Sequence, residues 1–259
     1  MKFSIITVVY NDYKNIEKTI LSVQSQSYKN IEHIIIDGNS NDGTSEIINK
    51  YCKKVRHFRK TDKSLYEALN KGIQKSRGEI IFSIHSGDIF SNKDILKKVN
   101  ALFKKNYDVV SGNVSFFNEN KKVIKKNWKI KLSDFNYKNF YKIPHTSLFV
   151  KKKIFKRIKN YSTKYKISSD LDFMIRLSKI KKNYFYLDKD IVYMKSGGLS
   201  TSKKNLSKKL IEDFNILFRY FGIFFLFFYI KKILIKIPGL FCFSKKNNNL
   251  KLSNQLKLF

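Results

Sequence analysis

The stretch Glu79–Phe90, EIIFSIHSGDIF, sets the interpretation of the first half of the chain. Its apolar run, Ile80-Ile81-Phe82, is short, β-branched and aromatic, which is typical of a buried strand. The run continues into His85-Ser86-Gly87-Asp88 and so delivers a carboxylate into a glycine-containing turn. In an open parallel sheet, ligands bind at the carboxyl ends of the strands. Asp88 is therefore a candidate ligand-binding residue, although many Gly-Asp pairs only form a turn before a helix.

Strands and helices alternate in the sequence before this stretch. Phe3–Tyr10 is a nearly continuous apolar run, as expected of a strand covered on both faces, and Ile31–Ile36 is a second such run. Val55–Phe58 predicts a weak third strand, and Ser64–Lys75 predicts an amphipathic helix. The alternation predicts an α/β fold with a mostly parallel central sheet, right-handed crossovers and flanking helices.

The pattern changes beyond residue 108. Four short strands are expected there: Val109–Phe117, Val123–Lys131, Tyr184–Leu187 and Ile191–Met194. A helix begins near Ser168, and the chain is helical again from about residue 203. We therefore expect a main domain over residues 1–202 and an amphipathic helical tail over residues 203–259.

The charge of the chain bounds its partners. There are 53 basic and 20 acidic residues, a formal net charge of +33, spread along the whole sequence. Such a charge attracts anionic membrane surfaces or nucleic acid. No zinc-finger, RNA-recognition or basic-zipper pattern occurs, so nucleic-acid binding is the lesser alternative. Cys52 and Cys242 lie far apart, which favours a reducing compartment over a disulfide framework. The N-terminus is typical of a first strand and not of a signal peptide.

Three runs occur in a characteristic order: SIITVVYND (4–12), IEHIIIDGNSNDGT (31–44) and DKSLYEALNKGIQKSRGEIIFSIHSGD (62–88). Together they resemble the family 2 glycosyltransferases of the GT-A fold, most closely the bacterial branch that builds surface polysaccharides. The likeness resumes at His145, at SSDLDFMIRL (168–177) and at SGGLS (196–200). It implies an inverting enzyme that moves a sugar from a nucleotide-diphosphate sugar to a hydroxyl of a saccharide or lipid-linked acceptor, assisted by Mg²⁺ or Mn²⁺.

The resemblance also implies roles for particular residues. Asp37 matches the position that accepts a hydrogen bond from the nucleobase, and Tyr10 could pack on the base or ribose. Asp88 matches the last acid of a metal-binding D-x-D motif, whose first acid is replaced here by Ser86. Mg²⁺ often uses one or two carboxylates plus substrate phosphates, so one Asp can suffice. Asp170 matches the catalytic base. The competing interpretations are that Asp37 caps its own loop, that Tyr10 is core, and that Asp170 is only a helix N-cap.

Asp62 and Lys63 precede a helix that resembles the family's donor-binding helix, so both could face the donor. The remaining weaker candidates are Asn11, Asn39, Tyr66, Asn70, His145 and Asp172. Asp172 lies two residues beyond Asp170, and such a pair cannot share one helix face. We therefore expect one of these two carboxylates to face the site and the other to point elsewhere.

The tail contains an aromatic block, Ile216–Ile230, followed by Lys231 and Lys232. No stretch offers about 20 uninterrupted apolar residues, so a conventional membrane span is not expected. An in-plane helix with lysines at the headgroups fits better, which places the protein on the inner, cytoplasmic face of the cell membrane. The alternatives are a buried helix that closes the domain, or a dimer contact. Since the first acid of the metal motif is missing, a non-catalytic scaffold at the membrane is the alternative function.

Overall fold

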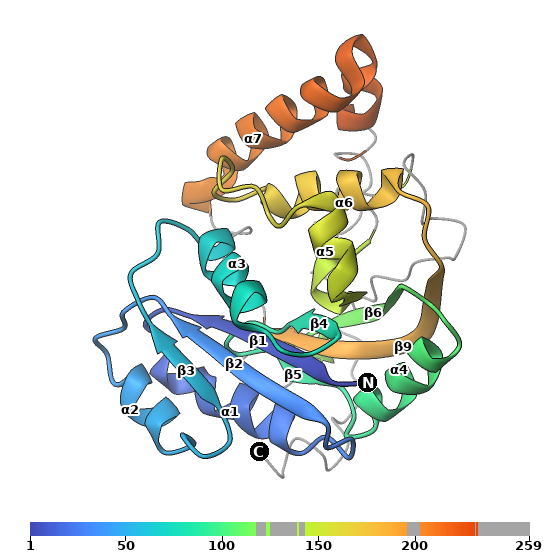
Figure 1. The fold of residues 1–259 in the computed structure, drawn as a ribbon. Coiled ribbons are helices and arrows are strands. Elements are labelled where there is room, and N and C mark those ends of the chain that lie inside the picture. The colour runs from blue at the N-terminus through green and yellow to red at the C-terminus, as the bar shows by residue number, and fades with distance from the viewer. Residues whose placement is uncertain (118–122, 125–138, 140–142, 196–202, 231, 233–259) are drawn as a thin grey trace.

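The computed structural model describes residues 1–117, 123–124, 139, 143–195, 203–230 and 232 (Figure 1). The strands are β1 (Phe3–Val9), β2 (Ile31–Asp37), β3 (Arg56–Arg59), β4 (Ile80–Ser83), β5 (Ile89–Phe90), β6 (Val109–Phe117), β7 (Val123–Ile124), β8 (Phe149–Lys151) and β9 (Tyr184–Lys195). They form one sheet in the order β3-β2-β1-β4-β8-β6-β9-β5, with β7 paired to β6. The predicted α/β class, with a central sheet and flanking helices, is confirmed.

The first half of the sheet is parallel. β1 pairs in parallel with β2 and with β4, and β2 pairs in parallel with β3. Phe3, Ile5 and Ile6 of β1 are fully buried, and they belong to clusters on opposite faces of the sheet. This two-sided burial is why the strand is apolar at almost every position. The carboxyl ends of β1, β2 and β4 consequently lie together at one edge.

The second half is mixed. β8 is antiparallel to both β4 and β6, whereas β9 is parallel to β6 and antiparallel to β5. The two strands expected at 184–187 and 191–194 are in fact one continuous strand, β9, with register shifts opposite Gly112–Val114. A Cβ at Gly112 would lie 2.8 Å or less from the carbonyl oxygens of Leu187 and Lys189, so only glycine fits there. Of the strand expected at Val123–Lys131, only β7 lies within the described residues.

Helices cover both faces of the sheet (Figure 1). α1 (Tyr13–Gln24), α2 (Thr44–Asn49) and α4 (Ile95–Lys104) pack on one face. α3 (Leu65–Lys75), α5 (Lys152–Ile158) and α6 (Ser169–Lys179) pack on the other, together with the short 3₁₀ helix η3 (His145–Ser147). α7 (Lys203–Phe221) lies beyond α6, at the greatest distance from the sheet (Figure 1).

The tail is both packed and exposed. Ile216, Leu217 and Phe228 are buried in the same core cluster as α5 and α6. After α7 comes the 3₁₀ turn η5 (Gly222–Phe224), and residues 225–230 fold back along α7, because the ring of Phe214 lies 4.7 Å from that of Phe225. Among the described helices, only Asn205–Ile230 is long and apolar enough to cross a membrane. The sequence predicts no membrane span, whereas this helical segment is long enough for one. However, because residues 225–230 fold back along α7, the segment forms a helical hairpin and not one straight helix.

Candidate active site

The loops that follow β1 and β2 are joined by hydrogen bonds at the carboxyl edge of the sheet. Asn11 and Asn39 adopt left-handed backbone conformations, with φ of 47° and 72°. The Asn11 N–H donates to Ser40 Oγ at 2.9 Å, and the Asn41 N–H donates to Asn11 Oδ1 at 3.0 Å. Asparagine tolerates this conformation better than most residues, so both positions serve the loop backbone. The two loops therefore act as one rigid unit.

Asp37 ends β2 and is fully buried. Its Oδ1 accepts from the Ser40 N–H at 2.9 Å and from Ser40 Oγ at 2.6 Å. Its Oδ2 accepts from Ser45 Oγ and lies 3.5 Å from His57 Nε2. Burial alone would raise the pKa of Asp37, but these hydrogen bonds outweigh it and hold the pKa well below its usual range. Oδ1 thus accepts two hydrogen bonds and Oδ2 accepts one.

Tyr10 lies directly after β1, and its side chain is 66% exposed, which excludes the core interpretation. A Cβ placed on Gly38 would lie 3.2 Å from Tyr10 Cδ2. The tyrosine ring thus rests on a glycine backbone immediately beside Asp37. An exposed ring in this position offers a flat surface to a base or a ribose.

The Ser86-Gly87-Asp88 turn is held from beneath by α1. Gly87 has a φ of 90°, and its N–H donates to Thr19 Oγ1 at 3.0 Å, while Thr19 Oγ1 donates to the Asp88 carbonyl at 2.9 Å. Asp88 is 4% exposed, and its Oδ1 accepts from the Lys195 N–H at 3.0 Å. Burial, with a smaller contribution from the negative charge of Asp12, raises the pKa of Asp88 to about 7. A buried carboxylate with this surplus of negative charge around it is suited to a cation.

Asp12 is a site residue that the sequence analysis missed. It follows β1, where its obvious role is a helix cap, yet its side chain makes no capping bond to α1. Instead Asp12 Oδ2 accepts from Ser86 Oγ at 2.7 Å, and Asp12 Oδ1 accepts from Asn15 Nδ2. The serine that replaces the first acid of the metal motif is therefore bonded to a carboxylate from the loop between β1 and α1. The only indication in the sequence that Asp12 belongs to the site is that it follows a predicted strand.

Asp88 and Asp12 supply oxygen ligands of the kind that Mg²⁺ and Mn²⁺ prefer. Within the described ranges, no group of three His, Cys, Asp or Glu side chains could hold a metal by itself. The two carboxylates therefore fit a cation that completes its coordination with ligand phosphates and water, as Mg²⁺ commonly does.

A third cluster surrounds Asp170, in the first turn of α6. Asp170 Oδ1 accepts from the Tyr66 hydroxyl at 3.1 Å, and Asp170 Oδ2 lies 3.2 Å from His145 Nδ1. Its side chain is 26% exposed, and the N-cap of α6 is Ser168, so Asp170 is not the N-cap. Burial alone would raise the pKa of Asp170, but the charges of His145, Lys209 and Lys232 hold it well below its usual range.

His85 joins this cluster to the Asp88 turn. The rings of His85 and His145 lie 6.3 Å apart, and the His85 carbonyl accepts the Asp88 N–H at 3.0 Å. Burial, with a smaller contribution from His145, lowers the pKa of His85 to about 4, so His85 is neutral at physiological pH. A continuous series of contacts thus runs from the Asp170 cluster through His85 to Asp88.

Asp62, Lys63 and Asn70 make contacts within α3 and its surroundings, and the Lys63 side chain is exposed. Asp62 forms an ion pair with Lys71 of α3, and the Lys63 N–H donates to Glu67 Oε2 at 2.9 Å. Asn70 holds the Tyr161 backbone, with Nδ2 donating to its carbonyl at 2.8 Å and Oδ1 accepting from its N–H at 3.0 Å.

Asp172 points away from Asp170, as its spacing in the sequence predicts. It accepts from Arg176 Nε at 2.8 Å and from the Tyr220 hydroxyl of α7 at 2.8 Å. Asp170 instead contacts His145 of η3 and Tyr66 of α3.

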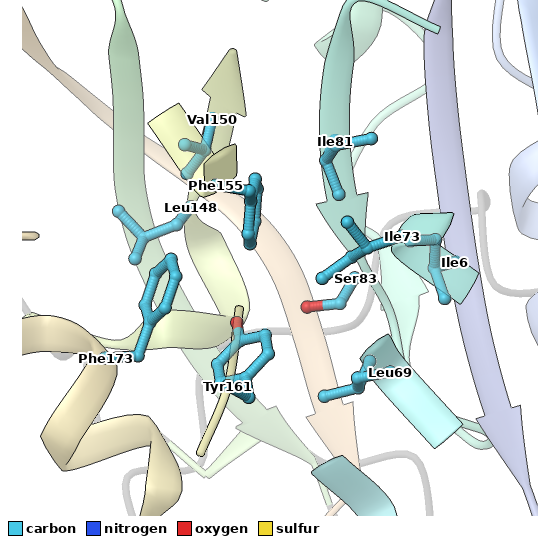
Figure 2. Close-up of a pocket in the computed structure, with 10 residues that line it drawn as sticks. All are labelled: Ile6, Leu69, Ile73, Ile81, Ser83, Leu148, Val150, Phe155, Tyr161 and Phe173. Atoms are coloured by element: carbon cyan, nitrogen blue, oxygen red, sulfur yellow. The ribbon is translucent and has the colours of Figure 1, made fainter. Parts of the chain in front are cut away.

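One enclosed pocket lies between the sheet and α3, α5 and α6, and it is not the ligand site. Figure 2 shows it lined almost entirely by apolar side chains, with the hydroxyl groups of Ser83 and Tyr161 as the polar exceptions. Its volume is about 10 Å³, which is roughly the space that one water molecule needs. The pocket is therefore too small for a ligand larger than water.

Comparison with known proteins agrees with this architecture. The family model for glycosyl transferase family 2 matches residues 4–169. An uncharacterized glycosyltransferase of Haemophilus influenzae is 29% identical over 224 residues, covering 83% of this chain and 87% of the relative. A PGL/p-HBAD biosynthesis glycosyltransferase of Mycobacterium bovis is 26% identical over 180 residues, covering 67% of this chain and 68% of the relative.

Among solved structures, residues 1–349 of S. aureus TarS in complex with UDP-GlcNAc match with a TM-score of 0.70 at 19% identity, covering 98% of this chain and 78% of that one. This chain spans 47% of the longer TarS chain. The structural likeness shows the fold, and the family model covers more than half of the sequence. The chain belongs to glycosyltransferase family 2.

Proposed function

We propose that this glycosyltransferase moves a sugar from a nucleotide-diphosphate donor to a hydroxyl of a saccharide or lipid-linked acceptor, with inversion, in the synthesis of a cell-surface glycan. The observation that carries the proposal is the series of contacts along one sheet edge, from the Asp37 loop through Asp12 and Asp88 to Asp170. The Asp12 N–H donates to Thr44 Oγ1 at 2.9 Å, which ties the Asp37 loop into this series. An enzyme of this type needs a base pocket, a diphosphate site and a proton acceptor, and the three clusters would serve as these in that order.

The donor end would use Tyr10 and the Asp37 loop for the nucleoside. TarS has been solved with UDP and with UDP-GlcNAc, which supports a uridine nucleotide as the first donor to test. Asp88, with Asp12 beside it, would hold Mg²⁺ or Mn²⁺. Such a cation neutralises charge that develops on the departing diphosphate.

The acceptor end would use the Asp170 cluster. The acceptor oxygen attacks the anomeric carbon, a new C–O bond forms, and the bond to the diphosphate breaks with its electron pair on the phosphate oxygen. The acceptor proton passes to the Asp170–His145 pair, because a general base must lie within hydrogen-bond reach of the hydroxyl. Attack opposite to the leaving group gives inversion.

We propose further that α7 and η5 bind an anionic membrane surface, so that the enzyme is peripheral on the inner face of the cell membrane. Several apolar side chains of this hairpin are more than half exposed: Leu206, Ile211, Phe218, Ile223, Phe224, Leu226 and Phe227. They form an apolar face on a chain with a net charge of +33. An apolar face combined with surplus lysine is the composition of interfacial helices.

Vesicle sedimentation tests the membrane proposal. Changing Phe224 and Phe227 together to Asp should weaken binding to phosphatidylglycerol-containing vesicles by about a hundredfold or more, since each buried ring contributes about 1.5–3 kcal/mol. Tyr13→Asp, at an exposed aromatic on the opposite face, is the matched control and should leave binding unchanged. Equal binding by both variants would contradict the proposal.

A thermal-shift screen against nucleotide diphosphates and UDP-sugars, with and without Mn²⁺, tests the activity. A ligand that binds only the folded state raises the melting temperature. A panel of alkyl glycoside acceptors then measures UDP release. Nucleotide binding without sugar transfer on any acceptor would favour the non-catalytic scaffold, for which the replacement of the first motif acid by Ser86 is the specific argument.

A further inference from the structure

We infer that Glu212 of α7 is a positioning residue for the transfer reaction, because it fixes the segment of chain that carries Asp170. The helical tail is then part of the catalytic apparatus and not only an anchor. This inference rests on the proposed transferase function, in which Asp170 lies at the acceptor end. It does not depend on the membrane proposal, because it concerns the inner face of α7 and not the exposed one.

The inner face of α7 packs against α6 (Figure 1). Four of its side chains recur at helical spacing and are buried: Glu212, Asp213, Ile216 and Leu217. Ile216 and Leu217 join the hydrophobic cluster that contains the apolar side of α6. Burying a carboxylate on such a face is costly unless it is paired or hydrogen-bonded. The partners of Glu212 therefore indicate what it does there.

Glu212 acts in place of a helix cap. Ser168 is the N-cap of α6, yet its side chain makes no capping hydrogen bond. Instead, Glu212 Oε1 accepts from the Lys166 N–H at 3.0 Å, and Glu212 Oε2 accepts from the N–H groups of Ile167 at 2.8 Å and Ser168 at 2.9 Å. Backbone N–H groups at the start of a helix have no partner within it. One side chain of α7 thus holds three consecutive peptides immediately before Asp170.

The Ile167 peptide is held from two sides. Its N–H donates to Glu212 of α7, and its carbonyl accepts from the Tyr66 hydroxyl of α3 at 2.8 Å. The same hydroxyl lies 3.1 Å from Asp170 Oδ1, while Asp170 Oδ2 lies 3.2 Å from His145 Nδ1. The place of the Asp170 carboxylate is therefore set jointly by α3, η3 and α7.

A second polar contact joins α7 to the beginning of α6. The Tyr220 hydroxyl donates to Asp172 Oδ1 at 2.8 Å. Tyr220 lies about two turns beyond Glu212, on the same side of α7. α6 is therefore attached to α7 at two points, one on each side of Asp170 in the sequence. Attachment at two points resists rotation of α6 about its axis, which would turn Asp170 away from its present neighbours.

The donor side of the site is held by other elements. Thr19 of α1 donates to the carbonyl of Asp88, and the Ser40 N–H donates to Asp37 Oδ1. A general base must lie within hydrogen-bond reach of the hydroxyl that it deprotonates. Loss of the Glu212 bonds should therefore displace the proposed base without displacing the nucleotide.

The test uses the full-length protein with the donor and acceptor pair that the panel above identifies. Glu212→Gln keeps the shape of the side chain but removes its charge and one acceptor oxygen. We expect kcat to fall by about 10–10²-fold, since a misplacement of about 1 Å can cost about 10²-fold. The Kd for UDP with Mn²⁺ should be unchanged, because the donor site is held elsewhere.

Leu96→Ala is the matched control for lost stability. Leu96 is fully buried in α4, on the opposite face of the sheet. Its truncation should lower the melting temperature to a similar extent as Glu212→Gln. At a temperature where both variants are folded, Leu96→Ala should keep the kcat of the wild type. A residue that only stabilised the fold would give the same result at position 212.

Tyr220→Phe removes a single hydroxyl and serves as the second variant if Glu212→Gln does not fold. Its kcat should fall by about fivefold, with the Kd for UDP unchanged, because a smaller displacement costs less. The inference is overturned if the folded α7 variants transfer sugar as fast as Leu96→Ala, or if their Kd for UDP rises as much as their kcat falls. Absence of transfer by the wild type on every donor and acceptor would instead contradict the proposed function, and the positioning role with it.

Discussion

The carboxylate of Glu212 gives the sharpest stability prediction. It projects from α7 and accepts three backbone N–H groups from the segment before α6, from Lys166 at 3.0 Å, Ile167 at 2.8 Å and Ser168 at 2.9 Å. Glu212→Gln replaces one oxygen with an NH₂ group, which cannot accept. One charge-assisted bond is lost at about 1.5–3 kcal/mol, and the other two become weaker neutral bonds. We therefore expect a loss of about 3 kcal/mol.

Thermal unfolding and hydrogen exchange measure this effect. For a chain of this size, about 3 kcal/mol corresponds to a fall of roughly 6–12 °C in melting temperature. The amides of Ile167 and Ser168 should also exchange faster. Glu46→Gln, at an exposed position of α2, is the matched control and should cost less than about 1 kcal/mol. A melting temperature and amide exchange identical to those of the wild type would refute the reasoning.

Three further predictions concern the site and the sheet. Burial raises the pKa of Asp88 to about 7, so the need to ionise this group destabilises the fold as pH rises from about 4 to 7. Asp88→Asn should therefore raise the melting temperature of the ligand-free protein at pH 8 but not at pH 4. The same variant should abolish stabilisation by Mn²⁺ with UDP. Asp37 has a lowered pKa, so its ionised carboxylate stabilises the fold above pH 4 and this contribution is lost as pH falls. Asp37→Asn should therefore make the free energy of unfolding depend less on pH below pH 4. It should also weaken UDP binding, measured by calorimetry. Gly112→Ala should destabilise the protein by about 2 kcal/mol or more in urea titration, because the new methyl group meets backbone oxygens at 2.8 Å or less; an unchanged midpoint would show that β9 can shift.

The parallel half of the sheet could be predicted because its strands are buried on both faces. Apolar runs such as Phe3–Tyr10 and Ile31–Ile36 have no other stable placement, and the polar residues after them mark the ligand edge. β9 was divided into two strands because Asp188, Lys189 and Asp190 interrupt its apolar pattern. In the structure, two of these carboxylates accept hydrogen bonds from the adjacent strand β6: Asn113 Nδ2 donates to Asp188 Oδ1 at 3.0 Å, and Ser115 Oγ donates to Asp190 Oδ2 at 2.8 Å. These partners lie about 75 residues away in the sequence, beyond what local periodicity can show.

The same reason limited the prediction of the site. Resemblance supplied Asp88 and Asp170 because their motifs are contiguous in the sequence. The pairing of Asp12 with Ser86 spans 74 residues, and no local pattern distinguishes that aspartate from an ordinary helix cap. Likewise, the contact between Asp170 and His145 depends on η3 and α6 meeting in space. Sequence alone could give these residues a place on the ligand edge but not their partners.

The stacking of α7 on α6 has a consequence for how substrates arrive. Asp170 is in the first turn of α6, and the exposed apolar face lies on the next layer outward, whereas Tyr10 and Asp37 belong to strand ends in the first half of the sheet (Figure 1). With α7 resting on a bilayer, a lipid-borne hydroxyl would diffuse in two dimensions toward Asp170, while a water-soluble nucleotide would enter from the bulk at the Tyr10 side. The two reactants would then meet without sharing an entrance, and detergent that lifts α7 from the lipid would slow delivery of only one of them.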